Sequence, residues 1–144
     1  MRYLFDTNTL SETVKPVPNA SVVAWLDGLS YDKCFVSVLT LGEIRKGVER
    51  LAPSARRERF KQWLEVALPN RFGRNVLDVN LEVADRWGRL TIEQARTPRL
   101  IIDSLLAATA LTHGLTLVTR DTDLVGIPGL EIFNPWAINE RQMK

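Results

Sequence analysis

Residues 101–121 read IIDSLLAATALTHGLTLVTRD, and this stretch decides the fold class. Its first twelve residues are mostly Ile, Leu and Ala over the length of a helix, which Gly114 closes. The short apolar run 115–119 follows at once and predicts a buried strand. An acid stands at each end of this helix–strand unit, Asp103 just inside the helix and Asp121 just past the strand.

The rest of the chain repeats this alternation of short apolar runs and helical spacing. Further strands are predicted at residues 3–5, 35–38, 76–79 and 130–133. Helices are predicted from the cap Asn19 to Gly28, over residues 40–51, from Pro53 to Pro69-Asn70, and after the cap Asn80. Strands separated by helices imply an α/β fold with a parallel sheet covered on both faces. We expect one domain over residues 1–144, with the loop around Thr97-Pro98 as a break between helices.

Composition indicates a packed protein of the cytoplasm. Hydrophobic residues make up 45% of the 144 residues, which is enough for a buried core. No apolar run approaches the roughly 18 residues that would span a bilayer, and Asp6 comes too early for a signal peptide. Cys34 is the only cysteine and lies in an apolar run, so we interpret it as a small buried hydrophobe.

Basic residues are concentrated in one part of the chain. Residues 45–74 hold nine Lys or Arg and three Glu, a net charge of +6, while the rest of the chain carries −4. A solvated helix face is the ordinary interpretation of such a segment. Because a separate acidic site is expected elsewhere in the chain, we favour a surface that attracts phosphate.

Four acids lie next to buried strands or among apolar helix residues, where burying a carboxylate lowers stability unless it has a structural or functional role. Asp6 and Asp121 each follow a predicted strand, and the carboxyl ends of strands form the ligand crevice of an open α/β sheet. Glu43 and Asp103 lie among apolar residues of predicted helices. Each acid also has an ordinary structural interpretation: Asp6 and Asp121 as caps, Asp103 as a charge at a helix N-terminus, and Glu43 as the partner of Lys46.

If the four acids converge, their chemistry is specific. Ionised carboxylates cannot share a small site without a compensating cation. Oxygen ligands, with a single histidine and a single cysteine in the chain, favour Mg²⁺ or Mn²⁺ over zinc. Such a metal activates water and neutralises charge on a phosphodiester during in-line displacement.

At these acids the chain resembles the PIN-domain nucleases, whose four acidic blocks it matches over essentially its whole length. The matching blocks are Leu4-Phe5-Asp6-Thr7-Asn8, Thr40-Leu41-Gly42-Glu43-Ile44-Arg45-Lys46-Gly47, Ile101-Ile102-Asp103-Ser104-Leu105-Leu106-Ala107-Ala108-Thr109-Ala110 and Leu117-Val118-Thr119-Arg120-Asp121. Within that family it looks like the VapC type of toxin, in its FitB-like branch. The narrower resemblance lies in Ser11-Glu12, Pro16-x-Pro18-Asn19 and Phe133-Asn134-Pro135-Trp136.

The resemblance implies a three-layer α/β/α fold with strand order 3-2-1-4-5 and a Mg²⁺-dependent endoribonuclease, with Mn²⁺ as a possible substitute. Asp6 and Asp103 would be the most direct metal ligands, and Glu43 and Asp121 would complete the pocket. Asn8 and Thr119 would orient the carboxylates or water, and Asp123 is interpreted as a loop cap.

The resemblance also implies partners. The protein would be the toxin of a type II toxin–antitoxin pair and a homodimer, held inactive by a cognate antitoxin and bound to operator DNA only through it. Large apolar side chains on two consecutive helices predict an exposed patch for the antitoxin beside the acids. These side chains are Leu41, Val48, Phe60, Trp63 and Leu64.

Other functions remain open at this point. A housekeeping RNA-processing enzyme or a structure-specific DNA nuclease would have the same fold, and an inactive RNA-binding or scaffold domain is the non-enzymatic alternative. A haloacid dehalogenase phosphatase would need a second Asp where Asn8 stands, and a receiver domain would need a Lys after a late strand, where Arg120 stands. His113 is interpreted as a helix-terminal residue, and the four Trp residues as core or dimer packing.

Overall fold

A computed structural model describes residues 1–90 and 100–138. The predicted break at Thr97-Pro98 lies outside the described residues. Within the described residues, no helix combines the length and apolar character needed to cross a membrane.

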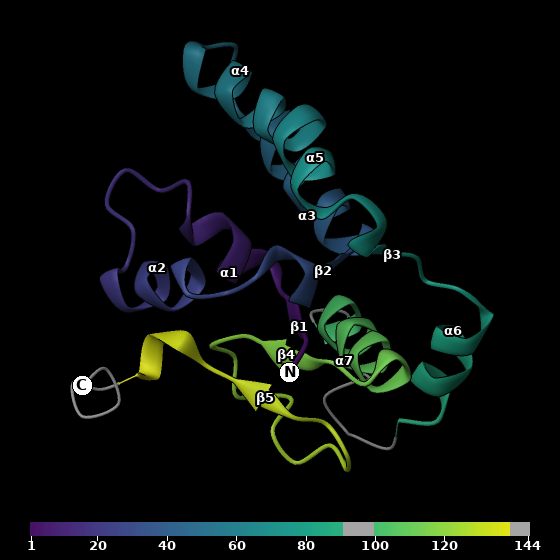
Figure 1. The fold of residues 1–144 in the computed structure, drawn as a ribbon. Coiled ribbons are helices and arrows are strands. Elements are labelled where there is room, and N and C mark those ends of the chain that lie inside the picture. The colour runs from purple at the N-terminus through teal and green to yellow at the C-terminus, as the bar shows by residue number, and fades with distance from the viewer. Residues whose placement is uncertain (91–99, 139–144) are drawn as a thin grey trace.

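A five-stranded sheet forms the centre of the molecule (Figure 1). Its strands are β1 (Tyr3–Phe5), β2 (Cys34–Ser37), β3 (Val76–Leu77), β4 (Thr116–Val118) and β5 (Ile132–Phe133). They lie in the order β3-β2-β1-β4-β5, and every neighbouring pair is parallel. This confirms the predicted fold class and strand order, and it makes β1 the central strand, with the strand order reversing around it.

Each face of the sheet packs against its own hydrophobic core, because successive side chains of a strand point to opposite faces. Phe5 lies in the core under α3 (Val38–Arg50) and α5 (Leu68–Phe72), together with Val36 and Phe72. Leu4 lies in the second core, with Leu106 of α7 (Ile101–His113). The sheet is therefore buried on both faces, as the continuous apolar strands predict.

Short helices connect the strands, and most begin at a side-chain cap. They are α1 (Thr7–Glu12), α2 (Ala20–Asp27) and α6 (Leu81–Gly88). The predicted caps Asn19 and Asn80 accept hydrogen bonds from backbone N–H groups of α2 and α6. Ser37 caps α3, so the helix begins at Val38, which the sequence pattern assigned to the strand.

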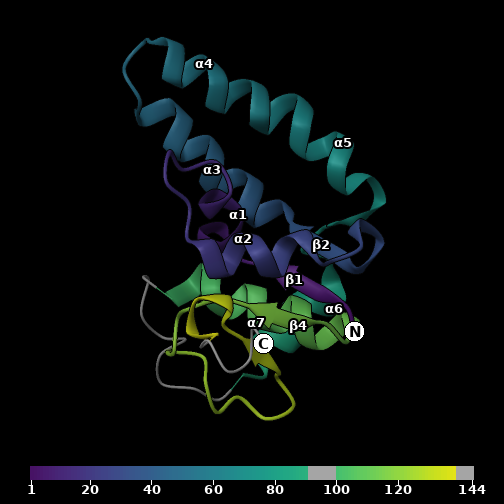
Figure 2. The same ribbon diagram turned by 60° about the vertical axis from the view of Figure 1, so that its left-hand side comes forward.

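The segment after β2 is a helical hairpin that projects beyond the sheet. Figure 2 shows α3 antiparallel to one long helix made of α4 (Ala55–Gln62), a π-helical turn (Trp63–Ala67) and α5. Ion pairs join the two arms: Arg45 Nη2 lies 2.9 Å from Glu65 Oε1, and Arg57 Nη2 lies 3.2 Å from Glu49 Oε2. Arg57 Nε also donates to the Val48 carbonyl. Arg45 and Arg57 therefore hold the hairpin together.

Two predicted ends of this long helix are wrong. Pro53 precedes the helix, which starts after the cap Ser54. Pro69 does not end the helix, which continues to Phe72. Proline lacks an N–H and crowds the preceding turn, and the π turn directly before it, where Leu68 N bonds to the Trp63 carbonyl, accommodates both effects.

Candidate active site

Asp6 stands at the carboxyl end of the central strand β1 and caps α1. Its Oδ1 accepts a hydrogen bond from Thr9 N at 2.8 Å, and its side chain is buried. Thr9 Oγ1 in turn donates to the Val118 carbonyl at the end of β4. The cap thus holds this carboxylate at the junction of the two central strands, and it uses one of the two carboxylate oxygens.

Glu43 reaches the same end of the sheet from α3. Its Oε1 accepts a hydrogen bond from Thr7 Oγ1 at 2.5 Å, which links the second turn of α3 to the start of α1. The alternative pairing with Lys46 is absent among the described residues. Glu43 is therefore turned toward Asp6 rather than lying on a solvated helix face.

The pKa of Asp103 is affected by the charges of the other three acids. Burial, the negative charges of Asp121, Glu43 and Asp6, and a hydrogen bond with Asp121 together raise this pKa from the ordinary carboxyl range to about 6. Like charges act in this way only at close range. These charge effects link the four acids that the sequence singled out, from the end of β1, the second turn of α3, the first turn of α7 and the loop after β4.

The loop after β4 holds Asp121 by its backbone and by its side chain. Asp121 N donates to Thr119 Oγ1 at 3.0 Å, and Asp121 Oδ1 accepts from Asp123 N at 2.9 Å. Thr119 is buried, and its hydroxyl accepts from the backbone N–H of Asp121, so its orienting role toward the carboxylates stays a prediction. The backbone amide of Asp123 donates to the Asp121 carboxylate, so in this loop the side chain of Asp121 is the cap, and the interpretation of Asp123 as a loop cap stays a prediction.

Two residues near the acids differ from expectation. Asn8 is exposed, and its side chain makes no hydrogen bond among the described residues. No contact of Asn8 with a carboxylate therefore supports the orienting role that was expected of it. Thr7 has that role toward Glu43, and the sequence analysis missed it. The available signal was its place between Asp6 and Asn8 in the first acidic block.

A fifth buried acid, Glu12, serves structure instead. Lys15 Nζ lies 2.7 Å from its Oε2, and Asn19 N donates to its Oε1. The hydrogen bond with Lys15 lowers the pKa of Glu12 below its usual range. Glu12 thereby ties α1 to the cap of α2, which explains its place in the FitB-like pattern.

The donor chemistry of the four acids fits a hard divalent cation. All donors are carboxylate oxygens, and none of the four pairs with a Lys or Arg within residues 1–90 and 100–138. In those same residues, however, no three Asp, Glu, His or Cys side chains stand together as a ready-made metal site. The carboxylates share one electrostatic environment, and a cation would have to draw them closer.

Two cavities adjoin the acids. A groove of about 250 Å³ begins at Thr7 and Glu43 and runs along the hairpin to Phe60 and Trp63. A second cavity, of about 320 Å³, lies beside Asp121 under the loop after β4. Open space for a substrate therefore adjoins both Glu43 and Asp121.

The predicted apolar patch on the hairpin is smaller than expected. Val48 and Leu64 are buried in the protein's own core, where they pack under the sheet-facing side of the hairpin. Leu41, Phe60 and Trp63 are partly buried against the same core. Of these five residues, Val48, Phe60 and Trp63 also line the groove beside Glu43, and Val48 does so as a buried residue of its floor.

Comparison with known proteins identifies the family. The PIN domain profile matches residues 3–130. The chain belongs to the PIN-domain family. This PIN domain is 36% identical over 137 residues to VapC ribonuclease Y4jK of Sinorhizobium fredii, covering 92% of this chain and 96% of that protein. It is 35% identical over 136 residues to Toxin FitB of Neisseria gonorrhoeae, covering 92% and 97%.

The fold of this PIN domain also matches a solved complex. The structure of FitAB bound to an IR36 DNA fragment superposes with a TM-score of 0.85 and 31% identity, over 95% of this chain and 97% of that chain. Together with the two sequence relatives, this match confirms the family that the four acidic blocks indicate. It also confirms the FitB-like branch indicated by Ser11-Glu12, Pro16-x-Pro18-Asn19 and Phe133-Asn134-Pro135-Trp136.

Proposed function

We propose that this PIN domain is a Mg²⁺-dependent endoribonuclease of the cytoplasm that acts as the toxin of a type II toxin–antitoxin pair. The observation that carries the proposal is the set of four acids: burial and the charges of Asp121, Glu43 and Asp6 together raise the pKa of Asp103, and Thr9, Thr7 and the loop after β4 hold the other three carboxylates. A cluster of carboxylates without a basic partner matches a nuclease that works on a metal ion. The similarity to proteins named VapC ribonuclease and FitB toxin supports RNA as the substrate and toxicity as the role.

In this proposal Asp6 and Asp103 are the most direct ligands of Mg²⁺, or of Mn²⁺, and Glu43 and Asp121 complete the pocket. The bound ion supplies a Lewis acid for the phosphodiester and lowers the pKa of a water. The protein's own part is to hold the carboxylates in place. Thr9 N holds Asp6, Thr7 holds Glu43, and the Thr119–Asp123 loop holds Asp121.

Inhibition follows from the same charges. An antitoxin that presents an Arg or Lys to the four carboxylates would form charge-assisted hydrogen bonds and compete with the cation. The similar FitAB structure is bound to DNA, which supports binding of operator DNA through the antitoxin. We further propose a homodimer, in keeping with that resemblance.

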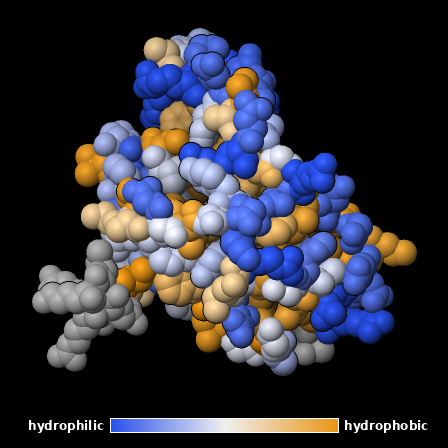
Figure 3. All heavy atoms as spheres, viewed as in Figure 1, coloured by the Kyte–Doolittle hydropathy of each residue, from blue (hydrophilic) through white to orange (hydrophobic). Residues whose placement is uncertain are grey.

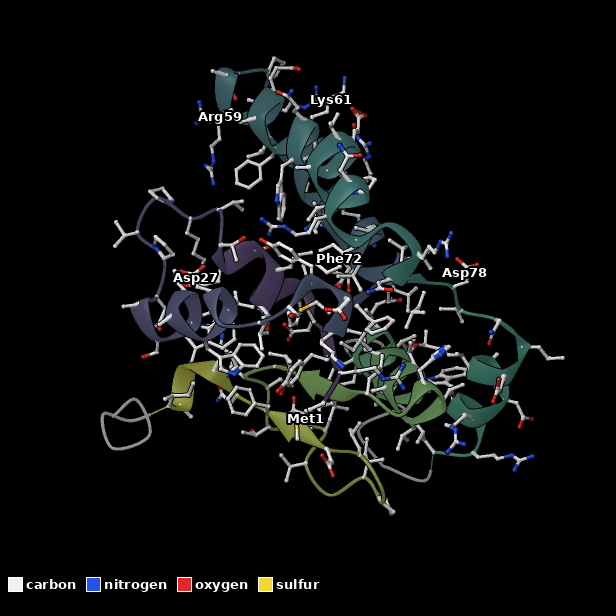
Figure 4. All side chains as sticks on the ribbon, in the orientation of Figure 1. Met1, Asp27, Arg59, Lys61, Phe72 and Asp78 are labelled. Carbon is white, nitrogen blue, oxygen red and sulfur yellow. The ribbon has the colours of Figure 1, made fainter. Side chains whose placement is uncertain are left out.

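Cleavage assays test the catalytic part of the proposal. The purified protein is expected to cleave RNA with Mg²⁺ or Mn²⁺ and to lose this activity in EDTA. Asp6→Asn keeps the shape of the side chain and removes the charge, so it should abolish most cleavage. Asp78→Asn is the matched control, because Asp78 is an exposed acid on the loop after β3 (Figure 4) and its charge is not among those that raise the pKa of Asp103. Unchanged activity in chelator would overturn the metal mechanism.

Induced expression tests the toxin role. Expression of the wild type without an antitoxin should arrest growth, Asp6→Asn should be harmless, and sequencing of RNA ends should reveal cuts only in the wild type. Harmless expression of a protein that cleaves RNA in vitro would favour a housekeeping RNA-processing enzyme. Cleavage of DNA in preference to RNA would favour the DNA nuclease.

A further inference from the structure

The groove beside Glu43 has an apolar floor and an acidic end. It has a volume of about 250 Å³ and runs between α1, α3 and the long helix of the hairpin. Its floor includes Ile44 and Val48, and the hydrogen-bonded pair Thr7–Glu43 closes one end. A group bound in this groove would therefore lie directly beside the proposed scissile phosphate.

Two aromatic rings and one arginine form the outer wall of the groove. The ring centroids of Phe60 and Trp63 lie 6.2 Å apart at an interplanar angle of 78°. The Arg56 guanidinium carbon lies 5.6 Å from the Phe60 ring centroid, with Arg56 exposed to solvent. Such a stack leaves the N–H edges of the guanidinium available to an anion.

The π-helical turn places Trp63 at this wall. Trp63 is the first residue of the π turn, and an α-helical continuation would rotate the residues that follow it relative to α3. Insertions of this kind occur mostly as single turns and are frequent at functional sites. Trp63 remains only partly buried although it packs on the core beside it.

Charge around the groove favours a polyanion. Within the hairpin, Arg45 forms ion pairs with Glu49 and Glu65, and Arg57 forms an ion pair with Glu49. Lys46, Arg50, Arg56, Arg59 and Lys61 have no acid within ion-pair distance among the described residues. Figure 4 shows Arg59 and Lys61 on opposite sides of α4, and Figure 3 shows hydrophilic side chains gathered over this end of the molecule.

We propose that this groove is a base-binding subsite for single-stranded RNA. One base of the substrate packs against Trp63 and Phe60, and Arg56 binds an adjacent phosphate. The proposal rests on the ribonuclease function proposed above and adds the strand type and the residues that select it. Proteins commonly bind single strands by stacking bases on aromatic side chains while nearby Lys and Arg side chains bind the phosphates. An apolar peptide in this groove would form no ion pair with the unpaired Lys and Arg side chains around it.

Binding measurements on a short RNA test the subsite. The probe is a labelled single-stranded 12-mer that the wild type cleaves, and its affinity is measured by fluorescence anisotropy in the Asp6→Asn background. Trp63→Leu and Phe60→Leu keep an apolar side chain and remove the stacking ring, and each should weaken binding roughly tenfold. Val66→Ala is the control, since Val66 is an exposed apolar residue of the same helix outside the groove, and it should bind like the parent.

Replacing single nucleotides of the probe by abasic ones locates the contact. At one position the abasic probe should bind the parent and the two Leu variants equally, because the stacked base is already missing. This comparison keeps the test decisive even if Trp63→Leu does not fold, since Phe60→Leu and the abasic probes remain. Affinities of both Leu variants equal to that of Val66→Ala would overturn the subsite and leave the groove to an apolar partner such as an antitoxin side chain.

The two proposals fail in different ways. If the wild type cleaves RNA in a metal-dependent manner and the groove variants bind normally, only the subsite is wrong. If the wild type neither binds nor cleaves any single-stranded RNA, the ribonuclease function and the subsite are both overturned.

Discussion

At the scale of single residues, the ordinary and the catalytic interpretations of an acid turn out to be compatible. Asp6 caps α1 and Asp121 accepts a bond from the loop amide of Asp123, yet the negative charge of both reaches Asp103. A backbone bond to one oxygen orients a carboxylate and leaves the other oxygen for a ligand. Capping therefore fixes the position of these acids, which a metal site requires.

Asp103→Asn should change how stability depends on pH. The pKa of Asp103 is about 6 in the folded protein and close to 4 in the unfolded chain. A folded-state pKa that is raised in this way contributes stability below about pH 4, and that contribution is lost as the pH rises through about 6. Without metal, we expect Asp103→Asn to be the more stable protein at pH 7.5 by about 1 kcal/mol, after allowance for solvent screening.

Thermal unfolding in EDTA between pH 4.5 and 8 measures this effect. The difference in Tm between Asp103→Asn and wild type should be a few degrees at pH 7.5 and should shrink toward pH 4.5. A difference that is the same at every pH would contradict the shared charge of the cluster. Cleavage with Mg²⁺ should be largely lost in this variant at all pH values.

Thr7→Val should lower cleavage by positioning Glu43 less well. The hydroxyl of Thr7 donates to Glu43 Oε1, and hydrogen bonds to charged groups contribute about 1.5–3 kcal/mol. We expect roughly a tenfold loss of kcat in Thr7→Val and recovery in Thr7→Ser, which keeps the donor. A loss that Thr7→Ser does not restore would point to the methyl group and to packing instead.

At the scale of elements, the hairpin formed by α3 and the long helix contains arginines that form ion pairs within it and arginines that do not. Those that pair with Glu49 or Glu65 hold the arms together, and the unpaired ones face solvent. The sequence counts both kinds alike as basic charge. The distinction decides which substitutions test RNA binding and which only disturb the fold.

Neutralising Arg56, Arg59 and Lys61 together with Gln should weaken RNA binding and flatten its salt dependence. Three fewer phosphate contacts would reduce the slope of log K against log salt by up to about 2 for a single strand. Titrations at several salt concentrations measure the slope. An unchanged slope would mean that this face is only solvated or that it binds the antitoxin.

Arg57→Gln is the matched comparison for that triple variant. Arg57 Nε donates to the Val48 carbonyl and its Nη2 lies 3.2 Å from Glu49 Oε2, so its loss affects the hairpin itself. We expect a fall in unfolding free energy of about 1 kcal/mol and little change in the salt slope. Calorimetry and the same titrations separate the two effects.

At the scale of the whole molecule, we predict a homodimer in solution. The resemblance to the FitB-like toxins is the ground for this prediction, and the described surface offers apolar side chains that a dimer could bury, among them Leu81 at 87% and Val125 at 68% exposure. Size-exclusion chromatography with light scattering should give twice the chain mass of 16.3 kDa, and a stable monomer across micromolar concentrations would refute the dimer.

The sequence by itself determined the layered fold and the identity of the four acids. Apolar runs, helical spacing and caps such as Asn19 and Asn80 are local signals, because each depends on residues that are neighbours in the chain. An acid directly after a buried strand is also visible locally, as at Asp6. Strand order and the roles of the acids came from the resemblance of the four blocks.

Only the tertiary structure decided which groups act together. The charge of Asp6 reaches Asp103 across almost a hundred residues of sequence, Thr7 rather than Asn8 holds Glu43, and Arg57 is a hairpin contact rather than a free cation. The long helix also passes through Pro69 because a π turn precedes it. The contacts depend on how distant segments pack, and the π turn is a local adjustment of backbone geometry. Neither feature produces a periodic pattern in the sequence. The physical reason is that a contact between distant residues is stabilised by the whole fold around it, so no local pattern encodes it.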